Sequence, residues 1–203
     1  RLEERWMESF PEFRRDVHWF LEHRQDLVQR CVSTVQNDDG TVHVLAIITL
    51  EQIQQLLQRL WDPAEFRSYY GLRSLSKYHE AHPYVYGEHV VRYSPGESLE
   101  KIKGGNSNWR GPLWFPTAFM MIESLRKLRR AYGSQFAIPS PASAEGMVTP
   151  DDIARGFANR LICIFTRDAS GRRPVHGQQR MWQEDPHWRD YLQFYEYFHG
   201  DDG

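Results

Sequence analysis

The sequence is poor in cysteine and has no apolar run long enough to cross a membrane. Its 203 residues include only Cys31 and Cys163, which lie too far apart for a CxxC motif. We therefore expect two buried free thiols in a reducing compartment, and a cytoplasmic location. The best candidate for a membrane segment, 44–50 (VLAIITL), falls far short of the roughly 20 residues that span a bilayer. Accordingly, no membrane partner is expected.

The net charge is also close to zero, because the chain has 25 Lys and Arg residues and 27 Asp and Glu residues. A nucleic-acid-binding surface needs an excess of cations against the phosphates, so we expect no nucleic-acid partner. The motifs GxGxxG, GxxxxGK[ST] and GxSxG are missing as well. Their absence argues against dinucleotide-binding, P-loop and nucleophile-elbow sites in their usual form.

One histidine-rich segment resembles a metal motif only loosely. His79 and His82 are three residues apart, whereas the HExxH motif places two histidines four apart on one helix face, and Pro83 follows at once. We expect these histidines to form local hydrogen bonds or line a pocket. No metal ion and no organic cofactor is expected.

The chain is rich in aromatic residues, which make up 14% of it. Apolar residues at three- and four-residue spacing predict helices, because this spacing places them on one helix face. Glycine, proline, serine and histidine fill the intervening stretches, above all residues 62–111. The pattern predicts an all-α protein with long ordered loops. The expected helices are 11–36, 50–61 with Thr49 and Gln52 as a capping box, 116–132 and 150–165, with an extended segment at 41–48.

The segment GGNSNWRGPLW, residues 104–114, combines groups that suit ligand binding. Its glycines allow close backbone approach, and its tryptophans offer flat apolar faces to a sugar ring. Arg110 adds a rigid fork of donors. The structural alternative is a cap loop whose tryptophans fill the core.

Glu196 is the second candidate, because it stands between aromatic residues in the segment FYEYF. Burial among these rings would make its ionisation costly and tunable. The alternative is an exposed glutamate on an edge strand or helix. The basic run 126–130 (RKLRR) is interpreted as a solvated helix face.

Residues 104–125 (GGNSNWRGPLWFPTAFMMIESL) resemble the catalytic region of glycoside hydrolase family 63 and its relatives. The shared motif is WRGPxW, here Trp109 to Trp114. A second match is Tyr195-Glu196-Tyr197-Phe198, followed by Gly200 and Gly203. The resemblance extends from about Trp61 to the end of the chain. The relatives include processing and bacterial α-glucosidases and mannosylglycerate or glucosylglycerate hydrolases.

This resemblance implies an all-α fold, part of an (α/α)6 toroid of the six-hairpin type. It also implies an inverting hydrolase of α-glucosidic or α-mannosidic bonds that needs no cofactor, with Glu196 as the general base. Its partner is a small carbohydrate or glycoside. The residues expected at the sugar are Trp109, Arg110, Gly111 and Trp114 from the motif, with Asn106, Asn108, His82 and Tyr84 in or near the pocket.

The chain departs from the family pattern in two ways. It has no segment that matches the aspartate general acid of the family, and its end lacks the HxTGW stretch. We therefore expect residues 1–203 to be the C-terminal portion of one catalytic domain, whose N-terminal half supplies the acid. Two alternatives stay open: a non-catalytic carbohydrate-binding helical domain, and a helical-repeat interaction module in which residues 62–111 are disordered or exposed.

Overall fold

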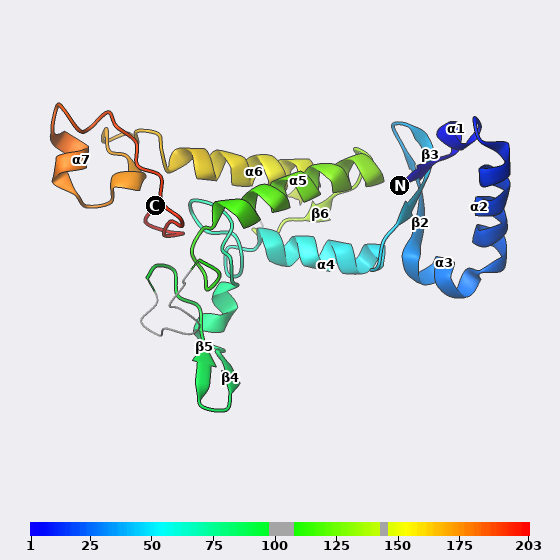
Figure 1. The fold of residues 1–203 in the computed structure, drawn as a ribbon, viewed down its shortest axis with the longest axis horizontal. Helices are drawn as coiled ribbons and strands as arrows, with labels where there is room; N and C mark the ends of the chain where they lie inside the picture. The colour runs from blue at the N-terminus through cyan, green and yellow to red at the C-terminus, as the bar shows by residue number, and fades with distance from the viewer. Residues whose placement is uncertain (98–107, 143–145) are drawn as a thin grey trace. The chain divides into compact units, whose positions relative to one another are not determined.

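A computed structural model describes residues 1–97, 108–142 and 146–203 (Figure 1). The chain forms two compact units. The first unit comprises Arg1–Gln58 and Ser124–Asp151, and the second comprises Arg59–Glu123 and Asp152–Gly203. Each unit is described by itself below.

The prediction of an all-α fold, part of an (α/α)6 toroid, is wrong. The described residues contain seven α-helices together with three antiparallel sheets, so the architecture is mixed. One sheet has three strands in the order β1-β3-β2, and the other two are the pairs β4-β5 and β6-β7. The strands are short, at two to six residues each, and short strands leave little periodic signal in a sequence.

The largest departure lies in the first unit. The single helix expected at 11–36 is instead α2 (Pro11–His23), α3 (Gln25–Cys31) and strand β2 (Val32–Asn37). β-Branched residues favour strand over helix at 32–35 (VSTV). The strand turns at Asn37, which pairs with Gly40, and returns as β3 (Gly40–Leu45). The expectation of an extended segment at 41–48 is therefore confirmed for most of its length.

Two short elements complete this sheet. Strand β1 (Leu2–Glu3) pairs with β3, so that Leu2 lies opposite His43, and helix α1 (Glu4–Met7) follows directly. The Met7 side chain is fully buried, as is that of Val42 in β3. Apolar contact of this kind fixes the start of the chain against the hairpin.

Three long helices follow the sequence prediction closely. Helix α4 (Leu50–Trp61) begins with the expected capping box, in which the Gln52 amide N–H donates to Thr49 Oγ1 and the Thr49 amide N–H to Gln52 Oε1. Helix α5 (Phe115–Tyr132) ends at Gly133, whose φ of 87° suits a residue without Cβ. Helix α6 spans Pro150–Cys163.

The remaining elements are short. They are the 3-10 turns η1 (Lys77–Glu80) and η2 (Pro174–His176), strands β4 (Tyr84–Tyr86), β5 (His89–Val91), β6 (Ile138–Pro139) and β7 (Met147–Val148), and helix α7 (Arg180–Glu184).

The core of the second unit joins segments that are far apart in the chain. Phe157 of α6 lies against Trp61 with ring centroids 5.2 Å apart, and both are buried. Leu113 and Phe198 pair through their backbones, with N–O distances of 2.8 and 3.0 Å. This pairing places the segment that precedes α5 beside the C-terminal segment.

Both cysteines are exposed, so the prediction of buried thiols is wrong. Cys31 ends α3, a short helix that buries none of its residues, and Cys163 ends α6. Among the described residues, each helix is too short or too polar to cross a bilayer.

Candidate functional site

The WRGPxW segment is held by backbone contacts on both sides. The Ser94 amide N–H donates to the Arg110 carbonyl at 2.8 Å, and the Gly111 amide N–H donates to the Ser74 hydroxyl at 2.9 Å. Leu113 pairs with Phe198 on one side and with Arg73 on the other. Three loops therefore fix the path of the segment before helix α5 begins.

Glu196 lies next to this segment. The Asn108 side-chain amide donates to Glu196 Oε1 at 2.9 Å, although the two residues are 88 positions apart. Asn108 is only 3% exposed, so the donor is held in place, whereas Glu196 is exposed. The aromatic neighbours do not enclose the carboxylate in the described part of the chain, because Phe194 and Tyr195 are exposed and only Phe198 is buried.

Trp109 and Arg110 differ in burial, although their side chains lie against each other. Arg110 is 1% exposed, whereas Trp109 is 41% exposed, and the Arg110 guanidinium carbon lies 5.1 Å from the Trp109 ring centroid. A cation on one face steadies an indole ring. Trp114 is half-buried, and its carbonyl accepts from the Ala118 amide at 3.0 Å, so this tryptophan caps helix α5.

The expected residues His82 and Tyr84 belong to other segments, just after η1 and in β4. Asn106 lies outside the described residues. His82 stacks on Tyr78 with ring centroids 4.1 Å apart, and its Nδ1 lies 3.2 Å from the Tyr78 carbonyl oxygen. It therefore bonds within its own turn, as the sequence predicted for the histidines of this segment. Tyr84 is exposed in β4.

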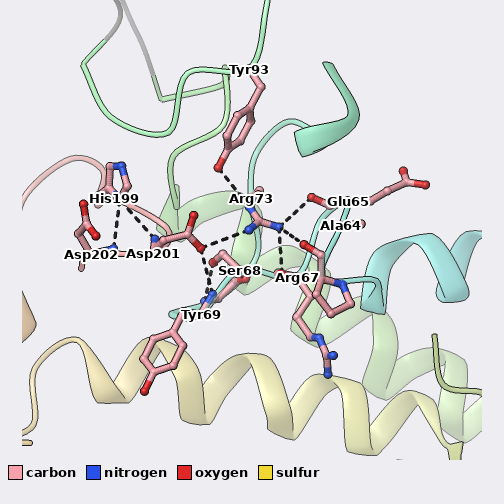
Figure 2. Close-up of polar contacts among 12 residues, drawn as sticks. Ala64, Glu65, Arg67, Ser68, Tyr69, Arg73, Tyr93, His199, Asp201 and Asp202 are labelled. Carbon is pink, nitrogen blue, oxygen red and sulfur yellow. Dashed lines mark hydrogen bonds and ion pairs between the residues drawn. The ribbon is translucent and has the colours of Figure 1, made fainter. Parts of the chain in front are cut away.

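Arg73 organises the framework beneath the candidate site, and sequence reasoning missed it (Figure 2). It is 4% exposed. Its Nη1 donates to the backbone carbonyls of Pro63, Glu65 and Arg67 at 2.9 to 3.0 Å. Its Nε donates to the Tyr93 hydroxyl at 3.1 Å, and its Nη2 to Asp201 Oδ1 at 3.2 Å.

These contacts connect the C-terminal turn to the loop that precedes Arg73. The Tyr70 amide N–H donates to the Gly200 carbonyl at 2.9 Å. His199 Nδ1 accepts from the backbone amides of Asp201 and Asp202 at 3.3 and 3.1 Å, so the turn is closed from within (Figure 2). The position of Glu196 thus depends on residues that stand more than 120 positions earlier.

Tyr93 is the second member of this framework. Burial raises the pKa of the Tyr93 hydroxyl, although the Arg73 guanidinium acts in the opposite direction. The phenol therefore stays protonated at neutral pH and accepts the Arg73 N–H without adding a charge. Within the C-terminal segment, the Tyr197 hydroxyl donates to the Glu97 carboxylate.

Gly111 is expected to be intolerant of a side chain. Its φ is 139°, and an added Cβ would lie 2.6 Å from the Tyr93 ring and 2.9 Å from the Ser94 carbonyl oxygen. Because the Tyr93 hydroxyl is hydrogen-bonded to Arg73, the ring cannot move freely away from the added Cβ. We expect Gly111→Ala to lower the free energy of unfolding of the second unit by about 2–4 kcal/mol, measured by hydrogen exchange of that unit.

Gly171→Ala is the matched control for this substitution. Gly171 has a φ of 80°, and no described atom lies within 4 Å of the added Cβ. Gly171→Ala is therefore expected to lower the free energy of unfolding by about 1–2 kcal/mol, which is the cost of a residue with a Cβ at positive φ. Equal losses in the two variants would show that the contact with Tyr93 is not the cause.

Comparison with known proteins adds one relative. No family model matches the chain. The chain is 39% identical over 209 aligned positions to the uncharacterized protein YMR196W of Saccharomyces cerevisiae, and the alignment covers 100% of this chain. It covers 19% of the yeast protein, so the chain spans about a fifth of the length of the curated relative it matches. The description of the yeast protein carries no functional information.

Proposed function

We propose that the chain is part of an inverting glycoside hydrolase that acts on α-glucosidic or α-mannosidic bonds. One observation carries the proposal: the hydrogen bond at 2.9 Å that joins Asn108, beside the WRGPxW motif, to Glu196. The two segments that resemble glycoside hydrolase family 63 are remote in sequence and adjacent in space. That adjacency is what a shared sugar site requires.

Glu196 serves as the general base in this proposal. A general base needs a carboxylate oxygen held in a fixed direction toward the attacking water. The Asn108 donor fixes Oε1 and so orients the carboxyl group. In the reaction, Glu196 takes a proton from water, the water oxygen bonds to the anomeric carbon, and the glycosidic C–O bond breaks.

The sugar is held by neighbouring residues. The exposed Trp109 ring offers an apolar face to the C–H groups of a pyranose, and the buried Arg110 guanidinium fixes the orientation of that ring. The general acid protonates the leaving oxygen, and we assign it to a segment outside this chain. The proposed enzyme works in the cytoplasm and needs no cofactor.

The exposure of Glu196 favours a second candidate function, a non-catalytic carbohydrate-binding domain. Such a domain keeps the Trp109 face and needs no water-excluding pocket. The two candidates differ in turnover, because the binding domain retains affinity for the sugar without hydrolysis.

The test follows the first-formed product by proton NMR. The full-length natural protein is incubated with a panel of α-glucosides and α-mannosides. An inverting enzyme releases the β-anomer first, because water attacks the face opposite the leaving group. Release of the α-anomer first would refute inversion. Sugar binding without turnover of any substrate would favour the binding domain.

A further inference from the structure

The first unit contains a cluster of metal-binding side chains that plays no part in the proposed hydrolase. Glu4 begins α1, His18 lies in α2 and His43 lies in β3. Each offers one ligand atom, and the three atoms all lie within 4.8 Å of one another. These residues are separated by up to 39 positions in the chain, so only the fold brings them together.

The cluster converges on one oxygen atom. His18 Nε2 and His43 Nε2 each lie 2.7 Å from Glu4 Oε1. Zinc is bound by imidazole nitrogens and carboxylate oxygens at about 2.0–2.2 Å, which places neighbouring ligands roughly 3.3 Å apart in a tetrahedron. Lengthening each of the two contacts by about 0.6 Å admits the ion. The side chain of His18 is 47% exposed and can make this movement.

Each of the two less mobile ligands is oriented by a neighbour. The Arg14 Nε–H donates to Glu4 Oε2 at 3.0 Å, which turns Oε1 toward the histidines. The Thr34 hydroxyl lies 2.9 Å from His43 Nδ1, and the His43 side chain is only 8% exposed. A hydroxyl both donates and accepts, so it can accept from Nδ1–H when Nε2 carries a metal. Metal-bound histidines ordinarily have such a partner on the second nitrogen.

We propose that Glu4, His18 and His43 bind a divalent transition metal of the zinc class. Two imidazoles and one carboxylate form a ligand set that zinc takes in proteins, and the exposed side leaves a further coordination position open to water. The ion joins α1, α2 and β3, so it also ties the start of the chain to the hairpin. This site is independent of the proposed hydrolase activity, which needs no metal.

The test measures binding of zinc to the whole chain after treatment with a chelator. Isothermal titration calorimetry with zinc chloride is expected to show one equivalent bound with a micromolar or lower Kd. His18→Ala is expected to weaken binding at least about 100-fold. His18 is half-exposed on its helix, so we expect the variant to stay folded, which far-UV circular dichroism verifies.

His23→Ala is the matched control, because His23 lies on the same helix, is equally exposed, and stacks on Trp19 away from the cluster. It is expected to bind zinc as the wild type does. Thr34→Val removes only the partner of His43 and is expected to weaken binding about 10- to 100-fold, as loss of such partners does at other sites. The proposal is overturned if the wild-type chain binds no zinc, or if His18→Ala and Glu4→Gln bind it as tightly as the wild type.

Discussion

Replacing Glu196 by glutamine is expected to lower kcat for glycoside hydrolysis by about 10²- to 10⁴-fold, the contribution that a general base makes. Glutamine has nearly the same shape and still accepts the Asn108 hydrogen bond through its side-chain oxygen. It cannot take a proton from water. We therefore expect KM to change little, because the Trp109 face that contacts the sugar is untouched. Initial rates on the substrate that the NMR panel identifies measure both parameters in the full-length protein.

Glu184→Gln is the control for this substitution. Glu184 is an exposed carboxylate in α7 that pairs with Arg180 at 3.1 Å. The same change of charge there is expected to leave kcat within twofold of the wild type. If Glu196→Gln keeps its kcat while the wild type is active, Glu196 is not the base. A rise in KM with unchanged kcat would instead assign Glu196 to binding.

The parts of the fold that could be predicted from the sequence carry their own local signals. The capping pair Thr49 and Gln52, and the prolines at positions 116 and 150, mark helix starts by satisfying or removing backbone donors. Each of these signals lies within four residues of the helix start that it marks. Helices α4, α5 and α6 were therefore placed correctly to within about two residues.

Of the sheets, the sequence predicts only the extended segment at 41–48, because the stabilisation of a sheet comes from pairing with strands elsewhere in the chain. Residues 32–35 continue the apolar spacing of α3, and their β-branched side chains disfavour another helical turn only weakly. The strand forms because Val35 pairs with Val42 and Thr34 pairs with His43 across a tight turn. The all-α expectation extended the local helical pattern over such segments, and the toroid was implied by the family resemblance. Both are wrong where partners distant in the chain decide the structure.

The candidate site shows the same division. The residue types of Asn108 and Glu196 make them candidates in the sequence. In the structure the two side chains form a hydrogen bond, which supports both assignments. Arg73 lies within the stretch that resembles the family, but nothing in the local sequence gives it a role. Its role exists only once residues 63–67, Tyr93 and Asp201 have gathered around it (Figure 2). The histidines of the metal cluster were missed for the same reason, since positions 18 and 43 have no ligand spacing.

Removal of the Arg73 guanidinium is expected to have the largest effect on stability. In Arg73→Met, three backbone carbonyls, the Tyr93 hydroxyl and the Asp201 carboxylate lose the Arg73 guanidinium, and Asp201 keeps the Tyr69 amide at 3.5 Å. The exposed Asp201 carboxylate can turn to water, but each buried acceptor left without a donor costs about 1–3 kcal/mol, so several together amount to about 3–5 kcal/mol. We expect a loss of that size in the free energy of unfolding. Because the chain has two compact units, hydrogen exchange of the second unit is the appropriate measurement.

Arg59→Met separates this network from a general effect of losing an arginine. Arg59 pairs with Glu65 at 2.7 Å but is largely exposed, and a surface pair of this kind is worth about 0–1 kcal/mol. Arg73→Lys keeps the charge and loses the planar fork, so it should recover only part of the loss. If Arg73→Met destabilises the second unit no more than Arg59→Met does, the carbonyls of residues 63–67 are satisfied without Arg73. The C-terminal turn, and with it Glu196, would then be held by the Leu113–Phe198 pairing and the Tyr70–Gly200 hydrogen bond.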